Sequence, residues 1–146
     1  MTEPIGLIHL AEPTGALQAR PPLVIDCSVL AGLLFEEPWM SQAEATMLGR
    51  DLQAPFLMQV EMAHVALKKQ RGGFTEVAAQ GLARFMLVEM ALHEVQPEPV
   101  FALARRYELS AYDACYLWLA GHLKCPLATF DRKLGEAARA HLASLA

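Results

Sequence analysis

Two continuous apolar runs, one near each end of the chain, stand out from the helical periodicity between them. Leu23 to Ile25 is the first run, and Pro126 to Phe130 is the second. A short apolar stretch without polar alternation is typical of a strand buried on both faces of a parallel sheet. Each run is followed at once by a carboxylate, Asp26 and Asp131 respectively. The pattern therefore predicts two buried strands whose carboxyl ends each carry an acidic residue.

Helical segments and weaker strand signals fill the space between these two runs. Capping residues, glycine stops and prolines set the expected boundaries. Strands that alternate with helices indicate an α/β domain, with a mostly parallel central sheet of about four or five strands flanked by helices. The expected helices cover about 28–35, 41–52, 59–70, 75–86, 97–107, 111–120 and 133–142, and further strand-like segments lie at 54–58 and 88–92.

The N-terminal segment lacks a clear element of its own. Prolines and a glycine interrupt residues 1–22, and only Ile5 to Ile8 has strand character. We therefore expect an N-terminal extension over residues 1–22 and one domain over residues 23–146. A chain of 146 residues is long enough for one domain with a proper core and short for two.

Composition changes this picture in four respects. The sequence is 54% hydrophobic and 19% charged, with a mean hydropathy of +0.25, so apolar surface is expected to be buried in a homo-oligomer or against a tight partner. The net charge of −4 argues against a surface that coats nucleic acid nonspecifically. No apolar run of membrane-spanning length and no basic leader is present, which favours a cytoplasmic protein. The three cysteines lie far apart and suggest neither a disulfide framework nor a zinc site.

Four acidic positions are the candidates for chemistry. Asp26 and Asp131 follow strands, while Glu61 and Asp113 fall near the starts of expected helices. Carboxylates that converge on one rim of a sheet raise one another's pKa, and a bound cation relieves this repulsion. Hard oxygen ligands in this number suit Mg²⁺ or Mn²⁺, which assist the hydrolysis of phosphodiesters. The sequence therefore suggests a metal-assisted phosphodiesterase.

Each of these residues also has a structural explanation. Ser110-x-x-Asp113 matches a capping box, and Asp131 could cap the last helix. Glu61 could simply favour the positive end of a helix dipole. Asp26 is harder to explain in this way, because a carboxylate that closes a buried strand loses its hydration unless something binds it.

Four motifs lie at residues 24–28, 60–61, 110–120 and 128–134. Their order resembles that in the PIN-domain ribonucleases, and most closely that in the VapC-like toxins of bacterial toxin–antitoxin pairs. The resemblance extends from about Leu23 to the C-terminus. Its most specific parts are Tyr-Asp-Ala-x-Tyr-Leu, from Tyr112, and Thr-x-Asp-Arg-x-Leu, from Thr129. The resemblance implies a PIN-like three-layer sandwich and a metal-dependent endoribonuclease that hydrolyses RNA. It also implies a homodimer and, for a toxin, an antitoxin protein that occludes the site.

The resemblance also implies roles for individual residues. Asp26, Glu61, Asp113 and Asp131 correspond to the acidic residues around Mg²⁺ or Mn²⁺. Ser28 and Thr129 stand where the family has hydroxyl residues that hydrogen-bond and orient those carboxylates. From their positions near the rim, Arg132, Lys133 and His64 are candidates to contact the RNA substrate.

Two other functions remain as alternatives. A PIN-like fold could act as a non-catalytic binding or regulatory module, although all four acidic positions are present. An aspartate-based phosphatase or a receiver-like domain could use Asp26 as a phosphoryl acceptor. The phosphatase pattern, however, needs a second aspartate two residues later, where this chain has Ser28.

Overall fold

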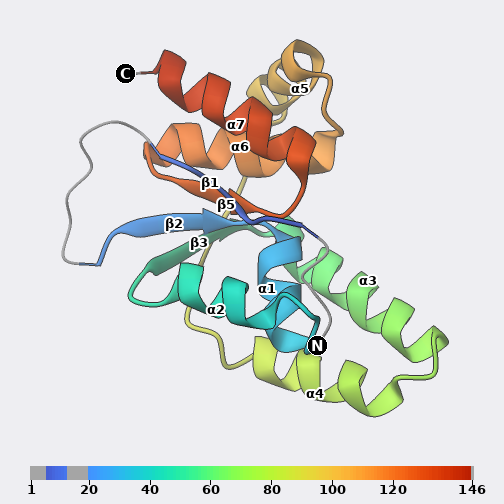
Figure 1. Ribbon diagram of the computed structural model, residues 1–146. Coiled ribbons are helices and arrows are strands. Elements are labelled where there is room, and N and C mark those ends of the chain that lie inside the picture. Colours follow the sequence, from blue (N-terminus) through green and yellow to red (C-terminus); the bar gives the residue numbers. More distant parts are fainter. Residues whose placement is uncertain (1–5, 13–19, 146) are drawn as a thin grey trace.

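A five-stranded sheet forms the centre of the molecule, in the order β1-β5-β2-β3-β4 (Figure 1). The computed structural model describes residues 6–12 and 20–145. Neighbouring strands run parallel except for β1, which is antiparallel to β5. The mostly parallel sheet confirms the predicted α/β class. The strands are β1 (His9–Ala11), β2 (Pro22–Ile25), β3 (Asp51–Pro55), β4 (Ala91–His93) and β5 (Leu127–Thr129).

Helices cover both faces of the sheet, so the described ranges form three layers (Figure 1). One face carries α5, α6 and α7, and the other carries α1 to α4. The predicted sandwich of helices around a central sheet is therefore confirmed. The helices are α1 (Cys27–Leu34), α2 (Met40–Met47), α3 (Leu57–Arg71), α4 (Thr75–Phe85), α5 (Pro97–Tyr107), α6 (Ala111–Leu123) and α7 (Arg132–Ser144).

The core explains why the first apolar run forms a strand. Leu23, Val24 and Ile25 are each 0% exposed, as expected for a parallel strand with helices on both faces. The chain leaves β2 at the carboxyl end of the strand, and Asp26 is the first residue after it. Within the described ranges, no helix combines the length and the apolar character needed to cross a lipid bilayer.

Several predicted boundaries are wrong. The strand-like segment expected over 54–58 ends at Pro55, because β3 spans Asp51–Pro55 and α3 already begins at Leu57. The helix expected over 41–52 ends at Met47, because Gly49 adopts a left-handed conformation (φ 73°) and the chain enters β3 at Asp51. The strand expected over 88–92 begins only at Ala91. Its first residues instead continue the turn that ends α4, where the Val88 amide donates to the Phe85 carbonyl at 3.1 Å.

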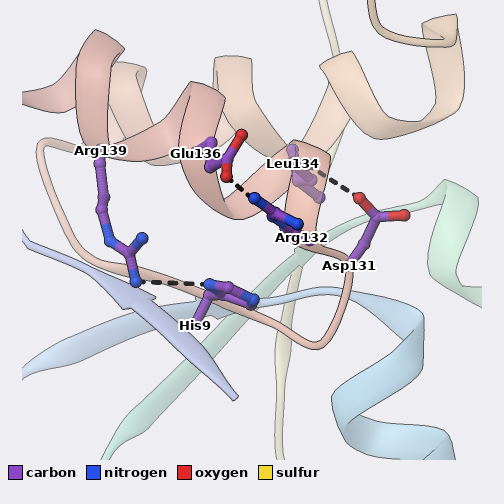
Figure 2. Close-up of polar contacts among 6 residues, drawn as sticks. All are labelled: His9, Asp131, Arg132, Leu134, Glu136 and Arg139. Carbon is purple, nitrogen blue, oxygen red and sulfur yellow. Dashed lines mark hydrogen bonds and ion pairs between the residues drawn. The ribbon is translucent and has the colours of Figure 1, made fainter. Parts of the chain in front are cut away.

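The N-terminal segment contributes a strand of its own, β1, at His9–Ala11 rather than at residues 5–8. Residue 5 of that prediction lies outside the described residues. His9 packs against Gly135 of α7 so closely that a Cβ added at Gly135 would lie 2.6 Å from the His9 Cβ. Arg139 Nη2 lies 3.3 Å from His9 Nδ1 (Figure 2). Part of the expected extension is therefore an edge strand of the same sheet.

Candidate active site

The site lies at the carboxyl edge of the two central strands. The chain runs from β2 to β3 on one side, and β5 later returns to the other side of β2. Ile25 and Ala128 are paired in register, so the residues that follow β2 and β5 emerge side by side. In open α/β sheets such a topological switch point is where ligands bind. Asp26 and Asp131 both lie at this point.

Asp26 is held in place from both sides of the switch point. Its Oδ1 accepts hydrogen bonds from the Ser28 hydroxyl at 2.6 Å and from the Val29 amide at 3.3 Å, so that it caps α1. Its Oδ2 accepts a hydrogen bond from the hydroxyl of Thr129, which is 103 positions away in the sequence. Both hydroxyl residues therefore contact the carboxylate that the sequence predicted them to orient.

The backbone after β5 fixes the direction of these two hydroxyl groups. The Phe130 amide donates to Ser28 Oγ at 3.1 Å, and the Asp131 amide donates to Thr129 Oγ1 at 2.9 Å. Each hydroxyl oxygen already accepts a hydrogen bond from a backbone amide, so its own hydrogen is free to point toward Asp26. This network favours the ionised carboxylate, and it leaves an acceptor position on Asp26 Oδ2 for a further ligand.

Glu61 is positioned by a residue whose role the sequence did not indicate. The Tyr116 hydroxyl donates to Glu61 Oε1 at 2.7 Å, and Tyr116 is only 1% exposed. Tyr116 lies in the apolar core. A buried phenol requires a hydrogen-bond partner, and that requirement is the signal that could have linked it to Glu61. Glu61 itself lies in the second turn of α3, because the helix begins at Leu57.

Asp113 and Asp131 differ in how they relate to the helices that they begin. Ser110 is the N-cap of α6, and its Oγ accepts the Asp113 amide at 3.1 Å, so the capping bond there uses the Asp113 backbone. Asp131 caps α7 with its side chain, since Oδ1 accepts the Leu134 amide at 2.8 Å (Figure 2). The structural role proposed for Asp131 is therefore real, and it occupies one of its two oxygens.

Electrostatic coupling links the four carboxylates, with Asp113 at the centre. Burial, with a small contribution from Asp113, raises the pKa of Asp26 to about 6 against the lowering effect of its hydroxyl and amide donors. Burial and then Asp113 raise the pKa of Glu61, whose bond from Tyr116 opposes the shift. Burial and then Asp131 raise the pKa of Asp113. The four acidic residues that the sequence singled out therefore influence one another's ionisation through Asp113.

Cys27 lies among these carboxylates without being reactive. Burial, followed by the charges of Glu61 and Asp26, raises the pKa of its thiol to about 12. The thiol therefore stays protonated near neutral pH, which removes it as a nucleophile or as a thiolate ligand.

The donor chemistry of the cluster fits a hard divalent cation. Within residues 6–12 and 20–145, no three His, Cys, Asp or Glu side chains are close enough to ligate one ion together. Mg²⁺ and Mn²⁺ suit such a cluster, because they take oxygen ligands and Mg²⁺ usually binds only one or two carboxylates directly, with several waters as its other ligands. Neighbouring negative charges contribute to the raised pKa values of Asp26, Glu61 and Asp113. A bound cation would reduce this repulsion and stabilise the ionised carboxylates.

The three candidate substrate contacts occupy different positions. His64 lies beside Glu61, where its charge lowers the pKa of that carboxyl, and Lys133 has the same effect on Asp113. Arg132 instead donates to Glu136 at 3.0 Å, one turn along α7, and Figure 2 shows its guanidinium turned toward Glu136 rather than toward the Asp131 carboxylate. Both members of that pair are exposed, so the contact is weak and Arg132 can leave it.

Comparison with known proteins agrees with this geometry. Residues 23–140 match the family model of the PIN domain. Ribonuclease VapC3 of Pyrobaculum aerophilum is 31% identical over 121 residues, which cover 78% of this chain and 92% of that protein. The crystal structure of PAE2754, also from Pyrobaculum aerophilum, has the same fold, with a TM-score of 0.62 and 22% identity over 86% of this chain and 95% of that chain. The chain therefore belongs to the PIN-domain family.

Proposed function

We propose that this protein is a metal-dependent endoribonuclease and the toxin of a toxin–antitoxin pair. The observation that carries the proposal is the coupling of four carboxylates at the switch point of the sheet, centred on Asp113. The ribonuclease name of the relative that shares most of the chain supports RNA as the substrate.

Asp26, Glu61, Asp113 and Asp131 would hold Mg²⁺ or Mn²⁺. When bound, such an ion makes water a better nucleophile and stabilises the charge that develops on a phosphodiester. Asp26 would use Oδ2, since Oδ1 already accepts two hydrogen bonds. Asp131 would use the oxygen that does not cap α7.

Other residues prepare the site for this chemistry. Ser28 and Thr129 would favour the ionised form of Asp26 and fix its orientation, while Tyr116 would do the same for Glu61. Lys133 lies next to Asp113, so its ammonium is available to a phosphate of the RNA backbone. Arg132 would join it on leaving Glu136, and His64 would meet the substrate on the side of Glu61.

The proposal extends to partners and domain organisation. We propose a homodimer, supported by large apolar side chains that remain exposed, such as Leu48, Met86 and Leu87. An antitoxin protein would block the acidic site, and a cellular RNA substrate is consistent with the cytoplasmic location expected from the sequence. The nuclease domain would span residues 23–146, with residues 1–22 as an N-terminal extension that adds β1.

Incubation of the purified chain with total cellular RNA tests the proposal. Parallel reactions contain Mg²⁺, Mn²⁺ or EDTA, and new RNA ends are mapped by sequencing. We expect discrete cuts with a metal ion, none with EDTA, and none for Asp113→Asn, which removes the central charge of the cluster. Asp51→Asn is the matched control, because Asp51 is an exposed aspartate at the amino end of β3, away from the site.

The outcomes separate the candidate functions. Cuts that persist in Asp113→Asn would exclude the proposed site, and cuts that persist in EDTA would exclude its metal dependence. If a folded and inhibitor-free chain cuts no RNA under any of these conditions, the non-catalytic binding module becomes the better explanation.

A further inference from the structure

A groove of about 390 Å³ opens directly beside the acidic cluster. Glu61 belongs to both, since it is coupled to Asp113 and also lines the groove. Leu57, Val60 and Val65 supply an apolar wall, while His64 and Tyr112 supply its polar groups. Mostly apolar walls, a few polar groups and a volume in the range of about 300–1,000 Å³ are typical of a small-molecule or ligand-group pocket.

Tyr112 is the distinctive residue of this groove. It is 63% exposed, whereas α6 is mostly buried from Ala114 to Ala120. It directly precedes Asp113, so the backbone that positions the central carboxylate also positions this ring. An exposed aromatic ring adds little to the core, and its face remains available for stacking.

We propose that this groove binds an unpaired nucleobase of the RNA, stacked on the ring of Tyr112, next to the phosphodiester at the acidic cluster. The inference rests on the proposed nuclease function and adds to it a subsite for one base, with Tyr112 as the residue that holds it. A flat aromatic ring with apolar walls accommodates a base, and His64 supplies a hydrogen-bonding group for its edge.

The charges of the groove favour a base over a phosphate or an acidic peptide. No lysine or arginine is among the described residues that line the groove, and these are the side chains that most often hold phosphates and carboxylates. A base brings no charge and needs no such partner. A base inside a duplex cannot present its face to the ring, so only an unpaired nucleotide can occupy the groove.

Substitutions at Tyr112 test the proposal through kinetics. Base–aromatic stacking contributes about 1–3 kcal/mol, which corresponds to roughly 5- to 150-fold in affinity. We expect Tyr112→Leu to raise KM for single-stranded RNA about tenfold with little change in kcat, because it removes binding shared by ground state and transition state. Tyr112→Phe keeps the ring and should retain most of the affinity. Phe101→Leu is the matched control, since Phe101 is equally exposed at 63% but lies on α5, outside the groove.

A fluorescence measurement detects base stacking under conditions in which the RNA is not cleaved. The probe is a set of short oligouridylates with one 2-aminopurine at successive positions, added with Mg²⁺ in the Asp113→Asn background so that the RNA stays intact. We expect the emission of 2-aminopurine to fall at one position, the fall to disappear with Tyr112→Leu, and annealing to a complementary strand to abolish it. Circular dichroism verifies that each variant is folded.

The possible results distinguish the two proposals. If wild-type protein cuts single-stranded RNA and folded Tyr112→Leu has the same KM and the same emission change, the base site is overturned while the nuclease stands. A chain that quenches the probe through Tyr112 but cuts no RNA would overturn the nuclease and retain a base-binding groove. Equal cutting of single strands and duplexes would contradict the base site as well.

Discussion

Asp26 carries a buried negative charge that its neighbours offset only in part. Three donors favour the ionised form, yet burial dominates and raises the pKa to about 6. Asp26 could be predicted as a candidate site residue because it directly follows a buried strand in the sequence. Its partner Thr129 is 103 positions away, so the pairing depends on β5 lying next to β2, which no local pattern encodes.

The raised pKa of Asp26 predicts that the metal-free protein loses stability as pH increases. The folded state holds the proton up to about pH 6 and the unfolded state only to about 3.8, so the free energy of unfolding falls between these values. Two pKa units correspond to roughly 3 kcal/mol. Urea unfolding in EDTA, at about pH 4 and about pH 7, should show a smaller decrease for Asp26→Asn than for wild type. Equal decreases in the two proteins would contradict the assignment to Asp26.

Tyr116 provides a second prediction at the residue scale. Tyr116→Phe keeps the buried ring but removes the donor to Glu61 Oε1. Loss of a partner that orients a metal-binding carboxylate typically costs 10- to 100-fold in activity or metal affinity. We expect RNA cleavage to weaken by about tenfold or more, with a higher Mn²⁺ concentration needed for half-maximal activity. Unchanged metal dependence would indicate that Tyr116 only fills the core.

At the scale of elements, the first turn of α6 separates a capping role from a chemical one. The sequence left both open, because Ser110-x-x-Asp113 is a capping box as well as part of a family motif. In the structure Ser110 supplies the capping oxygen, and the Asp113 carboxylate is coupled to the other acidic residues. The two roles therefore belong to two different side chains.

Replacement of the cap should affect stability more than activity. Ser110→Ala removes the acceptor for the Asp113 amide, and such a loss typically costs about 1 kcal/mol. Thermal unfolding should therefore shift to lower temperature, while RNA cleavage below that transition should remain close to the wild-type rate. Asp113→Asn should abolish RNA cleavage and leave the temperature of thermal unfolding close to that of wild type. A Ser110→Ala variant that is fully stable but inactive would assign the chemistry to the hydroxyl instead.

The elements themselves were predictable to different degrees. Helices with explicit signals agreed well: α5 begins at Pro97, as expected, and α3 ends where Gly72 and Gly73 follow it. The predicted extension of α2 through residue 52 failed because Leu52 continues the apolar pattern of the helix but pairs with Leu23 in the sheet. That pairing is a tertiary contact, and helical periodicity carries no information about it.

At the scale of the whole molecule, alternation of strands and helices was sufficient for the α/β class but not for the strand order. The position of β5 between β1 and β2 is what brings Thr129 and Asp131 to Asp26. The sequence showed strand character at residues 5–8 rather than at β1, because a three-residue edge strand has too little hydrophobic pattern of its own. It depends on the open surface at Gly135, where His9 packs.

Assembly of the acidic cluster from distant parts of the chain also has a consequence for synthesis on the ribosome. Asp26, Glu61 and Asp113 are all translated before Asp131, and Asp26 has only part of its support until β5 pairs with β2. A nascent or prematurely terminated chain that stops before residue 129 therefore lacks both the last carboxylate and the Thr129 hydroxyl that donates to Asp26. If the protein cuts RNA, its own messenger is protected from incomplete products, and activity begins only once the final strand has joined the sheet.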